Sequence, residues 1–100
     1  MVTLVNKLTV TGDISEFTGI LDRLTEFMRS QPGYLSSELL RSVRNPAVYV
    51  EVARWESAEA HRNAVTSGGF RERVAGLGAL ATVDPDVYEV IHENVGTAGR

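Results

Sequence analysis

The sequence predicts an α+β domain in which an antiparallel sheet carries helices on one face. Apolar side chains alternate with a two-residue period near both ends and in the middle of the chain, which is typical of strands. Between these segments, apolar side chains recur at three- and four-residue spacing, as in amphipathic helices. The resulting order, β-α-β-β-α-β, is the ferredoxin-like split βαβ arrangement.

The first strand and the first helix have the clearest patterns. The strand covers about residues 2–11. Asp13 offers an N-cap oxygen for the helix, with Glu16 three residues later as in a capping box. The apolar stripe of this helix is formed by Ile14, Phe17, Ile20, Leu21, Leu24, Phe27 and Met28. The sequence Gln-Pro-Gly at 31–33 ends the helix.

A hairpin is predicted next. Residues 34–44 and 47–55 have strand character, and Asn45-Pro46 between them is a turn signal. The second strand leads directly into a helix over about residues 57–66, for which Ser57 supplies the N-cap oxygen.

The last part of the chain is less regular. Ser67-Gly68-Gly69 is expected to break the second helix. A further helical segment carries Phe70, Val74, Leu77 and Leu80. A turn at 84–86 and a final strand at 87–93 complete one domain at 1–95, followed by a flexible tail at 96–100.

A single chain of this order has no element left to cover the second face of its sheet. The final predicted strand is also apolar on both sides, at Val87, Tyr88, Val90 and Ile91. Both observations predict a homodimer in which two sheets pack together.

Composition excludes several classes of function. The chain has 100 residues, which fits one domain of roughly 100–200 residues. Its formal charge of −3 and the lack of a basic stripe argue against nucleic acid. There is no cysteine, hence no disulfide and no thiol nucleophile. No apolar run approaches the roughly 18 residues of a membrane span, and no signal peptide is visible, so a cytoplasmic protein is expected.

Candidate catalytic residues gather around the predicted strand–helix corner. Glu51 and Trp55 share one strand face, with small Ala53 between them, and His61 follows on the first turns of the helix. A ligand could occupy the space above Ala53. In such a half-apolar place desolvation would raise the pKa of Glu51, which suits a general base. The alternative is that Trp55 is core and Glu51 is a surface carboxylate.

Asn6 is out of place on the apolar face of the first strand. A buried amide without partners costs about 1–3 kcal/mol, so it makes either a structural hydrogen bond or one to a ligand oxygen. Arg71 could neutralise an anionic ligand or lie in solvent, and Tyr34 and Tyr49 could line a flat aromatic cavity or only pack. No phosphate loop, dinucleotide fingerprint or convincing metal-ligand spacing is present, so no cofactor and no metal are expected.

The sequence resembles the antibiotic biosynthesis monooxygenase family of dimeric α/β barrels. The resemblance covers about residues 2–93. It is carried by Asn6, Pro32-Gly33-Tyr34, Trp55-Glu56-Ser57-Ala58-Glu59-Ala60-His61, Ser67, Phe70 and Asp86-Val87-Tyr88-Glu89-Val90.

The resemblance implies a homodimeric enzyme that oxidises electron-rich aromatic polyketides with O2, without prosthetic group or metal. A tryptophan of one such member carries over to Trp55, whereas that member has asparagine and tyrosine where this chain has Glu51 and His61. Its active-site arginine corresponds loosely to Arg71. Haem-degrading enzymes of the same fold have an axial histidine where this chain has Val74, which argues against haem.

The function expected from residues and resemblance together is conversion of a phenol or anthrone to a quinone. Glu51 or His61 would act as the base, and Asn6 and the Trp55 N–H would orient oxygens; Tyr34, Tyr49 and Arg71 would contact the substrate. Two alternatives stay open: a polyketide cyclase that uses the same cavity, and a non-catalytic dimer that binds small aromatics.

Overall fold

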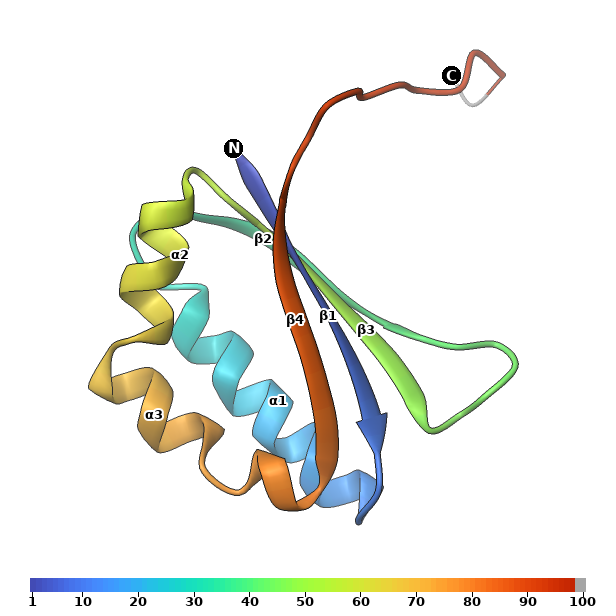
Figure 1. Ribbon diagram of the computed structural model, residues 1–100, viewed down its shortest axis with the longest axis vertical. Helices are drawn as coiled ribbons and strands as arrows, with labels where there is room; N and C mark the ends of the chain where they lie inside the picture. Colours follow the sequence, from blue (N-terminus) through green and yellow to red (C-terminus); the bar gives the residue numbers. More distant parts are fainter. Residues whose placement is uncertain (99–100) are drawn as a thin grey trace.

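The computed structural model describes residues 1–98. Four strands form one antiparallel sheet in the order β2-β3-β1-β4, and the helices cover one of its faces (Figure 1). The elements are β1 Val2–Val10, α1 Ile14–Met28, β2 Tyr34–Arg41, β3 Val48–Trp55, α2 Ala58–Val65, α3 Gly68–Val74, a 3₁₀ helix Leu77–Ala79 and β4 Ala81–Glu89. The predicted ferredoxin-like α+β class is confirmed, with the second helix divided into α2 and α3.

Each α-helix begins at a side-chain cap. Asp13, Ser57 and Ser67 accept a hydrogen bond from the backbone N–H three residues later, at 2.8, 3.1 and 3.2 Å. The predicted caps at Asp13 and Ser57 are therefore confirmed. Ser67 was expected only as a helix breaker, but it also starts α3, because its hydroxyl satisfies a free N–H of the new first turn.

The predicted bounds of the last strand were wrong. β4 starts at Ala81, runs through the expected turn at 84–86 and ends at Glu89, short of the expected 93. A proline inside a strand is tolerated here because β4 is an edge strand, where a missing N–H breaks no ladder on the outer side. Likewise β2 ends at Arg41, earlier than the expected residue 44.

Gly33 lies just before β2 and packs against the first turn of α2. Its φ of +88° is a left-handed conformation that favours glycine, and an added Cβ would lie 2.5 Å from the Ala60 Cβ. Its carbonyl accepts the Glu56 N–H at 2.8 Å. This contact brings the end of β3 and the first turn of α2 close to the end of α1.

Two groups of buried side chains lie between the sheet and the helices. The larger group consists of Leu8, Val10, Phe17, Ile20, Leu21, Leu24, Tyr49, Leu77 and Ala81, and the smaller of Ala53, Trp55 and Ala64. Tyr49 and Trp55 are at opposite ends of β3, so the two groups flank the middle of that strand. The middle of β3 is where Glu51 lies.

Beyond β4 the chain leaves the sheet (Figure 1). Residues 90–98 contain no helix or strand. The predicted flexible tail at 96–100 includes positions 99 and 100, which lie outside the described residues. No helix within residues 1–98 is long and apolar enough to cross a membrane.

Candidate active site

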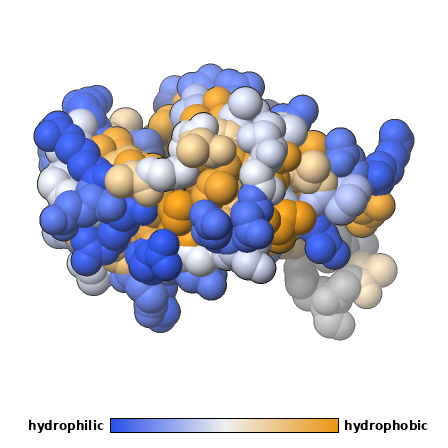
Figure 2. Space-filling model, turned by 90° about the horizontal axis from the view of Figure 1, so that it is seen from below, coloured by the Kyte–Doolittle hydropathy of each residue, from blue (hydrophilic) through white to orange (hydrophobic). Residues whose placement is uncertain are grey.

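A cavity of about 380 Å³ lies between the sheet and the helices. Most of its wall is apolar, and its polar side chains are Asn6 from β1, Glu51 and Trp55 from β3, and His61 from α2. The structure thus brings together on one cavity the four residues that the sequence analysis proposed as catalytic. Viewed from below, hydrophobic side chains gather in the middle of the molecule between hydrophilic flanks (Figure 2).

Asn6 and Glu51 form the first of two polar pairs that line the cavity. They are directly opposite each other in the antiparallel β1–β3 pair. Asn6 Oδ1 accepts the backbone N–H of Asp84 at 3.1 Å, so its amide N–H group is available to the Glu51 carboxylate, to which it donates. The register of the sheet therefore fixes both groups.

Burial dominates the electrostatics of Glu51. Desolvation raises the pKa of its carboxyl above the ordinary value, and the hydrogen bond from Asn6 lowers it only in part. Within residues 1–98 no cationic side chain forms an ion pair with Glu51. An unpaired carboxylate of raised pKa is a stronger base than one on the surface.

Trp55 at the end of β3 and His61 on α2 form the second polar pair. Their rings stand nearly edge to face, with centroids 5.6 Å apart and an interplanar angle of 73°. Trp55 Nε1 and His61 Nε2 are both buried, and neither has a hydrogen-bond partner. An unpartnered buried polar atom costs about 1–3 kcal/mol, so a ligand oxygen in the cavity that reached either nitrogen would recover part of that cost.

Burial also sets the charge of His61. Desolvation lowers the pKa of the imidazole below its ordinary value of 6.5. Neutral imidazole therefore predominates near neutral pH, with one ring nitrogen as donor and the other as acceptor.

The three residues expected to contact substrate lie outside the cavity lining. The Tyr34 ring packs edge-on against Trp55 at 5.3 Å, and its hydroxyl donates to Ser37. Tyr49 is buried against Phe17, with ring centroids 5.2 Å apart. Both tyrosines point to the helix side of the sheet, but the packed groups at the two ends of β3 enclose them.

Arg71 is exposed on α3. The cavity-facing residues of this helix are Phe70 and Val74. Successive helix residues are rotated by about 100°, which turns Arg71 away from a wall formed by its neighbour.

The sequence analysis missed most of the apolar wall. Met28, Val65, Phe70, Val74, Val83 and Pro85 all line the cavity. Helical and strand periodicity indicates that such residues face inward, but it does not distinguish a packed core from a cavity wall. The two-residue spacing of Ala81, Val83 and Pro85 is a signal for one inward strand face. The sequence Asp84-Pro85-Asp86 is also a turn signal, and for that reason Pro85 was not predicted to line the cavity.

Residues 1–98 contain no group of three or more histidine or carboxylate side chains placed to share a metal ion.

Comparison with known proteins identifies the family of the chain. Residues 1–76 match the model of the antibiotic biosynthesis monooxygenase family. The chain is 34% identical over 87 residues to deoxynogalonate monooxygenase from Streptomyces nogalater, a match that covers 87% of this chain and 74% of that protein.

Solved structures show the same fold. The crystal structure of SnoaB, a cofactor-independent oxygenase from Streptomyces nogalater, superimposes with a TM-score of 0.88 at 33% identity, over 92% of this chain and 94% of that one. A conserved protein from Methanosarcina mazei Go1 gives a TM-score of 0.81 at 18% identity, over 87% and 89% of the two chains, and shows the fold alone. With a family match over residues 1–76 and a relative at 34% identity, the chain belongs to the antibiotic biosynthesis monooxygenase family and is an enzyme of that family.

Proposed function

We propose that this protein is a cofactor-independent monooxygenase that oxidises a phenol or anthrone ring of an aromatic polyketide to a quinone with O2. The family and the relative named as a cofactor-independent oxygenase support the class of reaction. The observation that carries the proposal is the cavity itself. Its wall is mostly apolar, and it has one pair of hydrogen-bonding side chains on each side of the small residue Ala53. Such a space fits a flat ring system that carries oxygen.

The two polar pairs are separated along β3. Glu51 and Trp55 are four residues apart with Ala53 between them on the same face, so their Cα atoms are roughly 13 Å apart at about 3.3 Å per residue. That separation leaves room for one ring edge-on and a polar contact at each side. Trp55 Nε1–H donates to the ring oxygen at one end, with His61 as its second polar neighbour, and the opposite ring carbon faces Glu51.

Glu51 removes the proton in this proposal. The carboxylate takes a proton from the ring carbon or phenol, and the negative charge moves through the ring to the oxygen held by Trp55. A positioned base contributes about 10²–10⁴ in rate. Donors that face the developing oxyanion stabilise the anion in a site that excludes water.

The anion then supplies the electrons. It passes one electron to O2, and the resulting ring radical and superoxide combine to form a C–O bond. Protonation of the peroxide gives a hydroperoxide; loss of the second proton from that carbon breaks the O–O bond and releases water. One oxygen atom ends in the quinone, the other in water, and the substrate provides all four electrons.

Oxygen uptake tests the proposal. Purified, chelator-treated protein is mixed with a panel of anthrones and naphthols while O2 and quinone absorbance are followed. The expected result is one O2 consumed per quinone formed, above the rate of autoxidation without protein. Binding of the aromatics without any O2 uptake would overturn the oxygenase and favour a cyclase.

The proposed assembly is a homodimer through the face of the sheet opposite the helices. The register places Val5 opposite Val52 and Val50 opposite Leu40 on that face. These four side chains form a contiguous apolar patch across β2, β3 and β1, and Leu40 is 47% exposed. Burial of this patch against a second copy removes apolar surface from water.

A further inference from the structure

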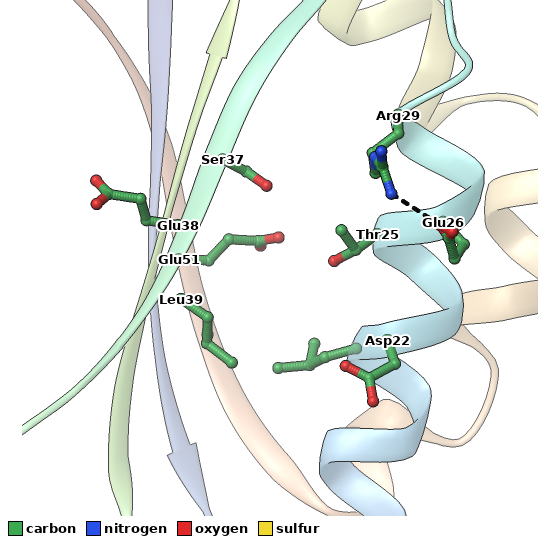
Figure 3. A pocket seen from close by; sticks show the side chains of 9 residues that line it. Asp22, Thr25, Glu26, Arg29, Ser37, Glu38, Leu39 and Glu51 are labelled. Carbon is green, nitrogen blue, oxygen red and sulfur yellow. Dashed lines mark hydrogen bonds and ion pairs between the residues drawn. The ribbon is translucent and has the colours of Figure 1, made fainter.

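A second cavity lies beside the first, and most of the residues that line it have polar side chains. It has a volume of about 420 Å³ and lies between α1 and the β2 side of the sheet. Asp22, Thr25, Glu26 and Arg29 face it from α1, and Ser37 and Leu39 from β2 (Figure 3). We call it the polar cavity.

Glu51 is part of both walls. Among residues 1–98, only Leu21 and Glu51 line both the polar cavity and the apolar active-site cavity. In Figure 3 the Glu51 side chain extends from β3 toward Thr25 on α1, with Ser37 on one side and Leu39 on the other. The partition between the two spaces is therefore one leucine and one carboxyl group.

The two cavities extend toward opposite edges of the sheet. The active-site cavity includes Val83 and Pro85 of the edge strand β4. The polar cavity includes Ser37 and Leu39 of the other edge strand, β2. A ring that fills the first space would leave the second one unoccupied and open to water.

We propose that Glu51 delivers the proton it takes from the substrate to water in the polar cavity, by a route separate from the one that the substrate uses. As the substrate C–H or O–H bond breaks, an O–H bond forms on the carboxylate. That O–H bond then breaks, water in the polar cavity accepts the proton, and the carboxylate is restored without transfer of electrons. The inference depends on the proposed function only for the source of the proton.

The groups around Glu51 suit this route. The Asn6 amide holds the carboxyl from the β1 side. The hydroxyls of Thr25 and Ser37 lie near the Glu51 carboxyl, and Glu38 points away from the cavity (Figure 3). Among the charged groups of α1, Arg29 pairs with Glu26 at 3.3 Å, which leaves Asp22 as an unpaired carboxylate at the opening. A negative opening attracts a hydrated proton.

Thiol labelling tests the partition directly, because the chain has no cysteine of its own. Glu51→Cys and, as matched control, Ala53→Cys are each treated with a cationic and with a small neutral methanethiosulfonate. The ratio of the two rates cancels the reactivity of the thiol itself. Ala53 lines the active-site cavity but not the polar one.

We expect the ratio of cationic to neutral rate to be at least about tenfold higher for Glu51→Cys than for Ala53→Cys, since exposure to water controls access of the charged reagent. Thr25→Leu, which places a larger apolar side chain without a hydroxyl beside residue 51, should reduce the ratio of Glu51→Cys to that of the control. Saturation with 1,8-dihydroxyanthraquinone should protect Ala53→Cys and leave Glu51→Cys reactive.

Equal ratios for the two variants, or a Glu51→Cys ratio that Thr25→Leu does not change, would overturn the inference. Neither result depends on catalysis. If the labelling pattern is as expected and no O2 is consumed, separate access of residue 51 to the polar cavity stands and the proposed oxidation, with its source of protons, fails. If O2 is consumed and both thiols behave alike, the oxidation stands and the separate route fails.

Discussion

At the scale of single residues, the environment decides what each polar side chain can do. Glu51 and His61 are both displaced from their ordinary pKa by burial, in opposite directions, and each thereby favours its neutral form. Trp55 is 1% exposed, yet its Nε1–H has no partner. Each of these features costs stability, and under the proposed function an oxygen-bearing ligand supplies the missing polar partner.

Trp55→Phe should lower kcat by about 10²–10³, because it removes a donor to the developing oxyanion. The measurement is steady-state O2 uptake with an anthrone substrate. Thermal unfolding of the same samples serves as control, since the smaller ring also leaves a void beside Ala53. Unchanged kcat in a folded variant would exclude the assigned role of the indole N–H.

Glu51→Gln should stabilise the protein at neutral pH. The folded-state pKa of Glu51 is raised, so the folded protein holds a proton that the unfolded chain has lost. Stability therefore falls as pH rises from the ordinary value of 4.5 through the raised folded value, and glutamine avoids that loss. Melting temperatures of both proteins should converge at pH values below the ordinary pKa and diverge above it. Parallel curves over the whole range would contradict the raised pKa.

At the scale of elements, the corner between β3 and α2 positions the second polar pair, Trp55 and His61. Ser57 fixes the first turn of α2, which places His61 one turn into the helix and over the end of β3. Tyr34 supports the indole from the start of β2. The positions of Trp55 and His61 therefore depend on how closely β2, β3 and α2 meet at Gly33.

Gly33→Ala should destabilise the protein by about 1–3 kcal/mol, the usual cost of a left-handed non-glycine residue. Contact with Ala60 adds to the effect. Gly68→Ala is the matched control: a Cβ there meets nothing within 4 Å, and the change should be neutral or stabilise by about 0.4–1 kcal/mol. Urea unfolding of the three proteins measures both values. Equal destabilisation by the two substitutions would refute the role of the turn.

At the scale of the whole molecule, the helices cover one face of the sheet (Figure 1). The cavity lies on that face, and the apolar patch of Val5, Leu40, Val50 and Val52 lies on the other. Residues on one strand alternate between the two faces. Val50 and Val52 belong to the patch, whereas Glu51 and Ala53 belong to the cavity. The proposed assembly and the proposed chemistry thus use alternate residues of the same short stretch of β3.

Val52→Lys should shift the protein from dimer to monomer, because a charge in a buried apolar interface is costly. Sedimentation velocity over a range of concentrations measures the change. Asn63→Lys, at an exposed position of α2 on the helix side of the sheet, is the control and should leave the assembly unchanged. A wild-type protein that sediments as a monomer at all concentrations would overturn the proposed dimer.

Sequence patterns predicted much of this protein for local reasons. The two-residue alternation placed Asn6 on the apolar face of β1 and Glu51 together with Trp55 on one face of β3, and the capping residues Asp13 and Ser57 placed the starts of α1 and α2. Such features depend on neighbours within a few residues, so they can be recognised without knowledge of the fold.

The tertiary structure decided what depends on residues distant in sequence. That β4 is an edge strand, and so accepts Pro85, follows from the order of the strands. That Tyr34, Tyr49 and Arg71 lie outside the cavity lining follows from packing around β3 and the rotation of α3. Asn6 faces Glu51 because of the β1–β3 register, and Glu51 divides two cavities because α1 and β2 leave a gap on its far side. Local periodicity determines the face on which a side chain lies, whereas its partners and the space around it are set only when all layers are packed.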